Sequence, residues 1–588
     1  NGFSYYQGEY HLFYQYYPYD THWNSMHWGH VVSKDLLHWK YLPAALAPDE
    51  DYDKIGCFSG RAIELEDGKQ LLLYTAVGQE TMEDGTVRDI QTQAVAVGDG
   101  KDYKKYEKNP VLTAKDLPEG ASKVDFRDPK IWKGKDGNFY CVIGSRPADG
   151  SGQILLYRSE NGFDWKFVSI LAKNKKRFGK MWECPDFFEL DGKHVLLTSP
   201  QDMLPEGLEY HNGNGTLCII GEMDQDKYTL KEQFAQSVDY GIDFYAMQTL
   251  GTPDGRRIMI GWMQNWDTIA HRCNDSKWFA QMSLPRELSV KNGRLYQTPI
   301  KELDAMRKDR VEYNNVVINN DTISLDKIEG RTIDMELVIR PEDKENVYKK
   351  FALRFAQNER FHTELCFRPD ESVLKIDRKF SGSERALVHQ RRCLVNGDAD
   401  ELKLRVILDR FSAEIFINDE FYEKQKDKWL HTGDMVMVQS GHVGHAAVIP
   451  EELDNSAAHA LIMFRHPKEK IEPYFLNYQY QTNKSKKKIE EITTGNTIKH
   501  ILASDMQEFV VDITNYDEQK KIGSYFQKLD HLITLHQRKC EETKSLKKYM
   551  LQKMFPENGN CVPKIRFSGF ADAWEQRKLK DYLEVSRE

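Results

Sequence analysis

Residues 126–144, "FRDPKIWKGKDGNFYCVIG", decide the fold, because an Asp-Gly turn at Gly137 separates two runs that are typical of β-strands. The same pattern of a turn glycine followed by an apolar run occurs four more times along the first 262 residues. A strand pair that recurs every 55 to 69 residues is typical of the blades of a β-propeller. The sequence therefore predicts an all-β, five-bladed propeller over residues 1–303. The other four segments are "QGEYHLFY" (7–14), "DGKQLLLY" (67–74), "DGKHVLLTS" (191–199) and "DGRRIMIGW" (254–262).

Two carboxyl residues occupy the same position in this repeat. In the last four blades, the residue nine positions before the turn glycine is Ser59, Asp128, Glu183 or Ala246. In the first blade, the same position precedes Asn1. If the blades superpose, these side chains point to a common region. A single acidic residue beside Pro is usually a solvated turn residue, but two at equivalent positions indicate a shared site. Paired carboxyl groups facing one cavity are what glycoside hydrolysis needs.

The neighbours of these carboxyl residues suit such chemistry. Arg127 would keep a nearby acid ionised or bind a hydroxyl group, and Trp182 would desolvate Glu183 and raise its pKa toward that of a working acid. Three histidines lie close together in the sequence, but no acidic cluster accompanies them, so we expect neither a metal site nor a cofactor. They are His27, His30 and His38.

A set of motifs in the first part of the chain resembles glycoside hydrolase family 32, which contains invertases, sucrose-6-phosphate hydrolases, levanases and inulinases. The resemblance covers about residues 1–419. It implies a five-bladed propeller followed by a β-sandwich. It also implies a retaining mechanism with an Asp nucleophile, an Asp that stabilises the transition state and a Glu acid/base. The motifs are "FYQYYP" (13–18), "MHWGHVVSKDLLHW" (26–39), "PAALAPD" (43–49), "CFSG" (57–60), "FRDPKIW" (126–132), "WECPDFF" (182–188) and "DYGIDFYAMQT" (239–249).

Carried over by motif, the resemblance makes Asp128 the transition-state stabiliser and Glu183 the acid/base. The family nucleophile belongs to a signature that ends Asp-Pro-Asn-Gly, of which the sequence supplies Asn1 and Gly2. The nucleophile would therefore precede Asn1, and we expect the hydrolysis of sucrose, sucrose 6-phosphate or fructans by this chain to be impaired. The resemblance implies that the substrate-binding residues are Asn1, Gln15, Trp23, Phe58, Ser59, Arg127 and, as a weaker candidate, Asp243.

Residues 304–419 change to short alternating strands, which predict a β-sandwich. The last run stops at "FINDEF" (416–421), where the family would continue with further strands. We therefore expect a sandwich that is cut short and has an unpaired edge.

The remainder of the chain has a different character. Apolar and neutral residues recur at a spacing of 3.5 from Ile522 to Cys540, which predicts a long helix with a coiled-coil face over residues 513–556. The region resembles the specificity subunit of type I restriction-modification systems. The resemblance implies an α+β fragment: a partial DNA target-recognition domain (420–512), the long helix, and the beginning of a second recognition half (557–588). The matching segments are "GDMVMVQSGHVG" (433–444), "EQKKIGSYFQKLDHLITLHQRK" (518–539) and "GFADAWEQRKL" (569–579).

This second resemblance leaves alternatives to a sugar hydrolase open. DNA and the restriction or methyltransferase subunits would be partners of residues 420–588, or the chain is a non-functional chimera. The lysine run Lys484, Lys486, Lys487 and Lys488 would contact phosphates, although such a run is more often a solvated face.

The composition indicates the cellular compartment of the protein. Nine cysteines without a CxxC pair favour a reducing compartment, so we expect a cytoplasmic protein. The sequence contains no run of 18 apolar residues, so it predicts no membrane span. The net charge of −9 comes from the first 420 residues, because the rest of the chain is close to neutral.

Overall fold

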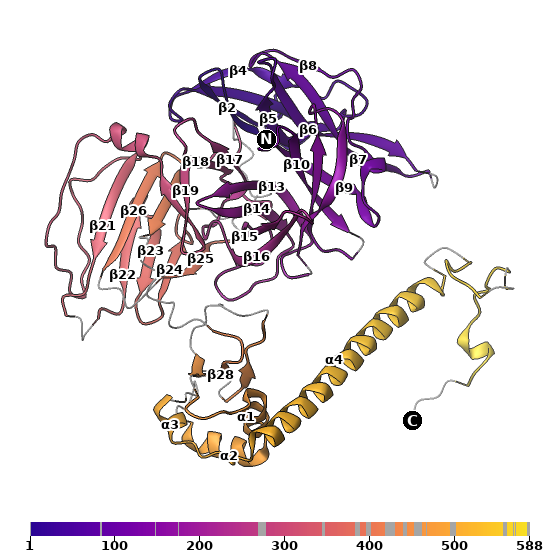
Figure 1. The fold of residues 1–588 in the computed structure, drawn as a ribbon, viewed down its shortest axis with the longest axis vertical. Coiled ribbons are helices and arrows are strands. Elements are labelled where there is room, and N and C mark those ends of the chain that lie inside the picture. Colours follow the sequence, from indigo (N-terminus) through magenta and orange to yellow (C-terminus); the bar gives the residue numbers. More distant parts are fainter. Residues whose placement is uncertain are drawn as a thin grey trace. The chain divides into compact units, whose positions relative to one another are not determined.

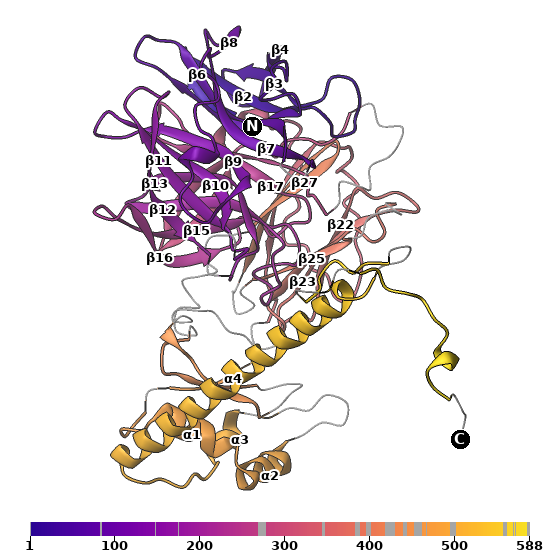
Figure 2. The ribbon, with the colours of Figure 1, turned by 90° about the vertical axis from the view of Figure 1, so that its right-hand side faces the viewer.

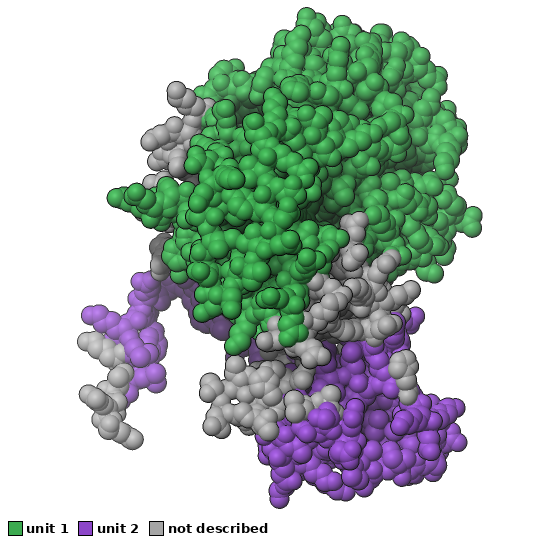
Figure 3. All heavy atoms as spheres, turned by 90° about the vertical axis from the view of Figure 1, so that its left-hand side faces the viewer, with its two compact units in different colours: residues 1–423 green, residues 424–588 purple. Residues whose placement is uncertain are grey.

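The computed structural model describes residues 2–82, 85–147, 149–174, 176–267, 278–343, 347–382, 388–395, 401–417, 430–438, 444–451, 461–465, 467–493, 501, 503–556, 561–567, 570 and 572–584. The chain divides into two compact units, residues 1–423 and 424–588, which Figure 3 colours green and purple.

Unit 1 begins with five antiparallel sheets, and each sheet takes four consecutive strands of the chain (Figures 1 and 2). The first strands of the five sheets contact one another in a closed ring, so the sheets are the blades of a propeller and the prediction is confirmed. Blade one is β1 (Gly2–Tyr6), β2 (Glu9–Tyr16), β3 (His27–Ser33) and β4 (Trp39–Leu46); blade two is β5 (Gly56–Glu64), β6 (Gln70–Thr81), β7 (Val87–Gly98) and β8 (Tyr103–Lys105); blade three is β9 (Ala121–Lys133), β10 (Phe139–Pro147), β11 (Gln153–Ser159) and β12 (Trp165–Lys173); blade four is β13 (Met181–Leu190), β14 (Lys193–Gln201), β15 (Leu217–Asp224) and β16 (Thr229–Gln236); blade five is β17 (Tyr245–Gly251), β18 (Arg257–Trp262), β19 (Arg286–Lys291) and β20 (Arg294–Pro299).

The predicted glycine turns join the first two strands of every blade. In blade one the turn has only two residues, Gln7 and Gly8, with φ of 48° and 86°. Positive φ at both positions is the geometry of a tight hairpin turn, and Gly adopts it without steric cost. The turn glycines of the other blades have φ between 76° and 86°, so all five predicted turns are confirmed.

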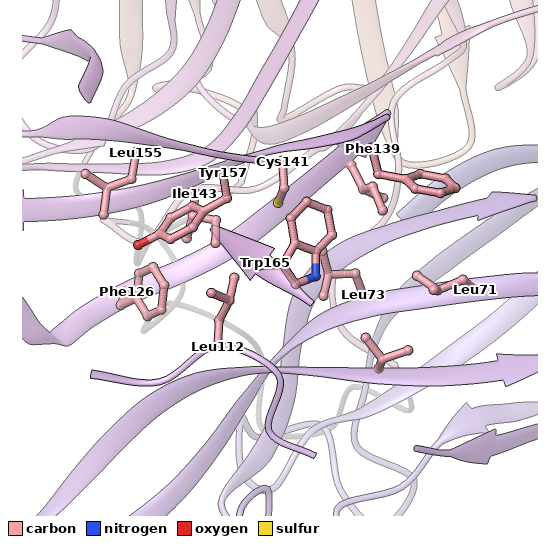
Figure 4. Close-up of a cluster of buried hydrophobic side chains, with 12 residues drawn as sticks. Leu71, Leu73, Leu112, Phe126, Phe139, Cys141, Ile143, Leu155, Tyr157 and Trp165 are labelled. Atoms are coloured by element: carbon pink, nitrogen blue, oxygen red, sulfur yellow. The ribbon is translucent and has the colours of Figure 1, made fainter. Parts of the chain in front are cut away.

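Apolar clusters fill the space between neighbouring blades. Figure 4 shows the cluster between blades two and three, which combines Leu71 and Leu73 of β6 with Phe126 of β9 and side chains of β10, β11 and β12. Burial of each large side chain stabilises the fold by about 1.5–3 kcal/mol. Equivalent clusters lie between the other neighbouring blades, including blades five and one.

Two further sheets follow the propeller in unit 1. Side chains from both sheets, such as Leu365 and Val406, form one apolar cluster, which confirms the predicted β-sandwich. Arg286 of β19 donates from Nε to Glu414 of β27 over 2.9 Å, and this buried pair joins the sandwich to blade five. The sandwich was predicted to be cut short at "FINDEF", but the residues directly after Ile417 lie outside the described part of the chain. The sheets are β21 (Ile333–Ile339), β26 (Leu402–Asp409) and β27 (Ser412–Ile417), and β22 (Phe351–Phe355), β23 (Thr363–Arg368), β24 (Val373–Asp377) and β25 (Gln390–Leu394).

Unit 2 combines a small sheet with helices around an apolar cluster that includes Met435, Met437 and Ile489. The predicted long helix is confirmed as α4 (Tyr516–Lys553), and the side chain of Asn515 caps it by accepting from the N–H of Glu518. Among the described residues, no helix is both long and apolar enough to cross a membrane. The other elements are β28 (Met435–Val438), β29 (Ala446–Val448), β30 (Leu461–Phe464), α1 (Pro473–Tyr480), α2 (Asn483–Ile492) and α3 (Ala503–Gln507).

Candidate active site

The innermost strands of blades two to five each carry a β-bulge, where two residues interrupt the regular pairing. The first bulge residues are Phe58, Asp128, Cys184 and Ala246. Three of them have positive φ, which costs a non-glycine residue about 1 kcal/mol or more and is often found at active sites.

This register corrects the predicted equivalence of residues. The first bulge residue stands nine residues before the turn glycine in blades three and five, where it is Asp128 and Ala246. In blades two and four the first bulge residue lies one position away from the residue that the nine-residue spacing selects. The distance from the bulge to the turn glycine is eight to ten residues, because strand and turn lengths differ between blades. Asp128 is therefore equivalent to Cys184, and Glu183 is the residue before the bulge.

The residues before the bulge meet across three blades. Arg127 of β9 donates from Nε to Oε1 of Glu183 over 2.9 Å, and the hydroxyl of Tyr245 in β17 lies 2.7 Å from Oε2. Gln201 at the end of β14 donates to the same Oε2 over 2.9 Å. The Glu183 side chain is thus held by an ion pair and two neutral donors, and the residue keeps 9% of its surface exposed.

The carboxyl group of Asp128 has a distinct environment. Its Oδ2 accepts from the backbone N–H of Cys184 over 2.9 Å, and its own N–H donates to Thr75 Oγ1 over 2.7 Å. Burial and the nearby charge of Glu183 raise the pKa of Asp128 to about 6, although Arg127 and the Cys184 N–H oppose this shift. Asp128 therefore changes charge near neutral pH.

Arg127 is the cation between the two carboxyl groups. Burial works against its charge, but Glu183, Asp128 and Asp125 outweigh burial, so the pKa of Arg127 is raised above its ordinary value. Asp125 accepts from Arg127 over 3.1 Å and pairs with Arg146 over 2.6 Å. These contacts fix the guanidinium beside Glu183.

Other predicted pocket residues come from blades one and two. The rings of Trp23 and Phe58 make an edge contact with centroids 5.4 Å apart, and the Trp23 side chain is largely exposed. Gln15 donates to the carbonyl of Cys57 over 3.4 Å, and its Oε1 is buried without a hydrogen-bond partner. Ser59 hydrogen-bonds to the thiol of Cys184, next to Asp128.

One predicted residue, Asp243, has its ion-pair partner outside this cluster. Asp243 forms an ion pair with Arg378 of the sandwich. Asn1 lies outside the described residues, and the nucleophile expected before it stays a prediction.

The sequence analysis did not identify Tyr245, Gln201 and Thr75. Tyr245 could have been found from the repeat, because it stands ten residues before its turn glycine, as Arg127 does. Gln201 and Thr75 lie on second strands, where no motif marks them.

The histidines have other partners. His30 is buried beside His11, with Nε2 3.0 Å from His11 Nδ1, and burial lowers its pKa to about 3. Within the described part of the chain, no group of three or more His, Cys, Asp or Glu side chains is placed to hold a metal ion.

A buried carboxyl group with a raised pKa, a second one held by hydrogen-bond donors and an arginine beside it are the kinds of group that cleavage of a glycosidic bond requires. Together with the propeller and sandwich, they define unit 1 as a glycosidase. The family model "Glycosyl hydrolases family 32 N-terminal domain" matches residues 1–299, and the C-terminal model of that family matches residues 302–422. The chain belongs to glycosyl hydrolase family 32.

Similar proteins agree with this assignment. A sucrose-6-phosphate hydrolase of Zymomonas mobilis is 35% identical over 430 residues, which cover 71% of this chain and 81% of the relative. A raffinose invertase of Escherichia coli is 34% identical, with 71% and 84% covered. The solved structure of sucrose-6-phosphate hydrolase from Lactobacillus gasseri superposes with a TM-score of 0.61 at 31% identity, covering 71% of this chain and 83% of that one.

A third family model, "Type I restriction modification DNA specificity domain", matches residues 399–545. The match includes the sheet of unit 2 and most of α4. The chain therefore combines a family 32 enzyme with a segment similar to a DNA specificity domain.

Proposed function

We propose that unit 1 binds β-fructofuranosides such as sucrose, sucrose 6-phosphate or fructans, and that its site is built for retaining cleavage of the fructosyl bond. The observation that carries the proposal is the pair of buried carboxyl groups, Asp128 and Glu183, on neighbouring innermost strands with Arg127 between them. The printed names of the relatives, which include sucrose-6-phosphate hydrolases and a raffinose invertase, support fructosyl substrates.

Glu183 is the proposed acid/base. A general acid must lie within hydrogen-bond reach of the leaving oxygen, and Glu183 is the less buried of the two carboxyl residues. The donors Gln201 and Tyr245 hold Oε2, so the carboxyl plane is fixed before the sugar arrives. In the second half of the reaction the same group would activate water.

Asp128 is the proposed transition-state stabiliser. An ionised carboxylate favours the positive charge that develops on the fructosyl ring. With its pKa raised to about 6, Asp128 performs this role above that pH and loses it in more acidic solution. The retaining mechanism also needs a nucleophile, which the sequence analysis predicts before Asn1.

The fructosyl pocket is proposed to comprise Asn1, Gln15, Trp23, Phe58, Ser59 and Arg127. Gln15 supports the proposal, because its buried and unpaired Oε1 would accept from a sugar hydroxyl. Asp243 is a weaker candidate for this pocket, because Arg378 already pairs with its carboxylate.

Calorimetric titration with fructose and sucrose tests the proposal, together with an assay of released glucose. In a chain extended by the nucleophile predicted before Asn1, D128N and E183Q should each lower the rate of hydrolysis at least about a hundredfold, whereas E183Q should still bind fructose. The control is E189Q, a change on the same strand β13 at an exposed residue that pairs with Lys135. Equal loss in E183Q and E189Q, or no binding of fructose by any form, would contradict the proposal.

For unit 2 we propose contact with DNA and with restriction or methyltransferase subunits, supported by the match of residues 399–545. Lys484, Lys486 and Lys487 are exposed on α2, although Lys484 pairs with Asp512. A gel shift at low salt should be weakened in K486A/K487A and unchanged in K520A, which removes an exposed lysine from α4. No shift with the unaltered chain would refute this part of the proposal.

The proposed location is the cytoplasm. Seven cysteines among the described residues are free thiols, which supports a reducing compartment.

A further inference from the structure

A cluster of charged side chains follows the bulges on the innermost strands of the propeller. Lys130 and Asp186 stand two residues after the first bulge residues of β9 and β13. Arg61 and Thr249 stand three residues after those of β5 and β17. All four residues are buried, and none is more than 7% exposed. Because the innermost strands surround the propeller axis, the cluster lies at the axis, beyond the two carboxyl residues of the candidate site.

The cations of this cluster meet at Thr249. Its carbonyl oxygen accepts from Nη1 of Arg61 over 2.7 Å and from Nζ of Lys130 over 3.0 Å. Its hydroxyl accepts from Nη1 of Arg257, the first residue of β18, over 3.4 Å. The guanidinium of Arg257 also lies over the ring of Phe188, 4.4 Å from the centroid. Three cationic side chains from three blades therefore converge on one buried residue.

The cluster has more positive than negative charge. Asp186 is the acidic side chain within it, and its Oδ2 pairs with Lys130 and accepts from the Thr249 N–H over 2.6 Å. Asp186 is also the acidic group whose charge favours the charged forms of Arg61 and Arg257. In the part of the chain that the structure describes, neither arginine forms an ion pair of its own. Three cations thus share one carboxylate.

Burial makes this imbalance unfavourable. Burial lowers the pKa of Arg61 to about 10; the charge of Asp186 opposes this shift, and the like charge of Arg257 adds to it. Both arginines therefore keep their charge at neutral pH, and they exceed the single carboxylate even when Lys130 is neutral. Like charges repel more strongly where water is excluded than at the surface. A counter-ion between the guanidinium groups would relieve this repulsion.

The donors of the cluster are suited to a small anion. A guanidinium group has five N–H donors, and in the described structure Arg61 and Arg257 each use one of them for a hydrogen bond. The remaining donors are typical of anion binding. Asp186 would repel an ion of higher negative charge, and the burial of the surrounding side chains favours a small one. A monatomic halide meets both requirements.

We propose that Arg61, Lys130 and Arg257 form a binding site for a small monovalent anion, such as chloride, on the propeller axis. The three residues belong to blades two, three and five, so the bound anion stabilises the ring by holding these blades together. The site is separate from the proposed fructosyl pocket, because none of its residues belongs to that pocket.

Urea unfolding of the full chain tests the proposal. Sodium chloride is varied at constant ionic strength, with sodium methanesulfonate as the replacement salt. An anion that binds only the folded state raises its stability with concentration, so the midpoint of the unit 1 transition should rise by about 0.5–1 M urea when chloride reaches about a hundred times its Kd. R61M and R257M each remove one cation and should abolish this rise.

The matched control is R158M. The side chain of Arg158 is 46% exposed and pairs with Asp136 over 3.7 Å on the surface of the propeller, so R158M should keep the full dependence on chloride. In crystals of the unaltered chain grown with bromide, an anomalous peak should lie beside Arg61 and Arg257. This measurement does not depend on the folding of a variant. Absence of that peak, no rise with the unaltered chain, or an equal rise in R61M, R257M and R158M would each overturn the proposal.

Discussion

Replacement of Lys130 by Met tests the buried ion pair that lies next to the two carboxyl residues. Lys130 follows Asp128 by two residues on β9, and its ammonium group pairs with Asp186 of β13. The ammonium also donates to the carbonyl of Thr249 in β17 over 3.0 Å, and the Thr249 N–H donates to the same oxygen of Asp186 over 2.6 Å. One charge pair thus links three innermost strands just after their bulges. Met has a similar length but no charge.

The expected loss of stability follows from the burial of the pair. The side chains of Lys130 and Asp186 are 4% and 0% exposed, and Asp186 Oδ1 has no hydrogen-bond partner in the described structure. Removal of one partner from such a pair costs about 3–5 kcal/mol, because the other charge stays buried without compensation. Burial and the like charge of Arg61 lower the pKa of Lys130. The ammonium is therefore less favourable than in an isolated pair, and we expect the lower end of the range, about 3 kcal/mol.

Urea unfolding followed by tryptophan fluorescence measures this loss. A decrease of about 3 kcal/mol shifts the midpoint of the unit 1 transition by about 1 M when the slope is about 3 kcal/mol/M. The control is K135M, which removes a lysine that is 93% exposed and pairs with Glu189 at the surface. It should cost less than about 1 kcal/mol. Indistinguishable midpoints for K130M and K135M would refute the reasoning.

Two further predictions concern the site and a third concerns the cysteines. The pKa of Asp128 is raised from 3.8 to about 6, so this group makes folding less favourable as the pH rises through that window. D128N should therefore be more stable than the unaltered chain at pH 8 and equally stable at pH 4; a constant difference in urea midpoint would contradict this. Y245F removes a buried hydroxyl that lies within hydrogen-bond distance of Glu183 and of the Ser199 carbonyl, so it should lower hydrolysis about ten- to a hundredfold and the free energy of unfolding by about 1–3 kcal/mol, whereas full activity would exclude a role for the hydroxyl. Burial raises the pKa values of the Cys57, Cys141 and Cys184 thiols, so iodoacetamide should label exposed Cys561 but not these three, as peptide mass spectrometry would show; urea should make all of them reactive.

The architecture was predictable because it repeats. Gly137 and its four equivalents must have positive φ in short hairpins, and this local requirement is visible in any single blade. The sandwich strands were predictable from alternation, with the exception of β25, whose sequence "QRRCL" has too little apolar character to stand out.

The candidate site was predictable only in part. Asp128 and Glu183 were found from the repeat, but their exact equivalence was not, because a bulge adds residues without a sequence signature. Asp243 was expected near the pocket, but its carboxylate pairs with Arg378, which lies 135 residues later in the chain. Local sequence cannot reveal a partner on another domain. The pKa of Asp128 likewise depends on burial by several blades.

The five blades are not equally well connected. The chain crosses directly from each blade to the next, but blade five continues into the sandwich, and no peptide link returns it to blade one. That junction is closed by side chains alone, such as Phe3 and Leu12 against Leu250 and Ile258. Because no peptide link spans this junction, it is where the ring would open first under force or denaturant. The candidate site takes Gln15 from blade one and Tyr245 from blade five, so partial opening of this junction would separate these two sides of the site before any blade unfolds.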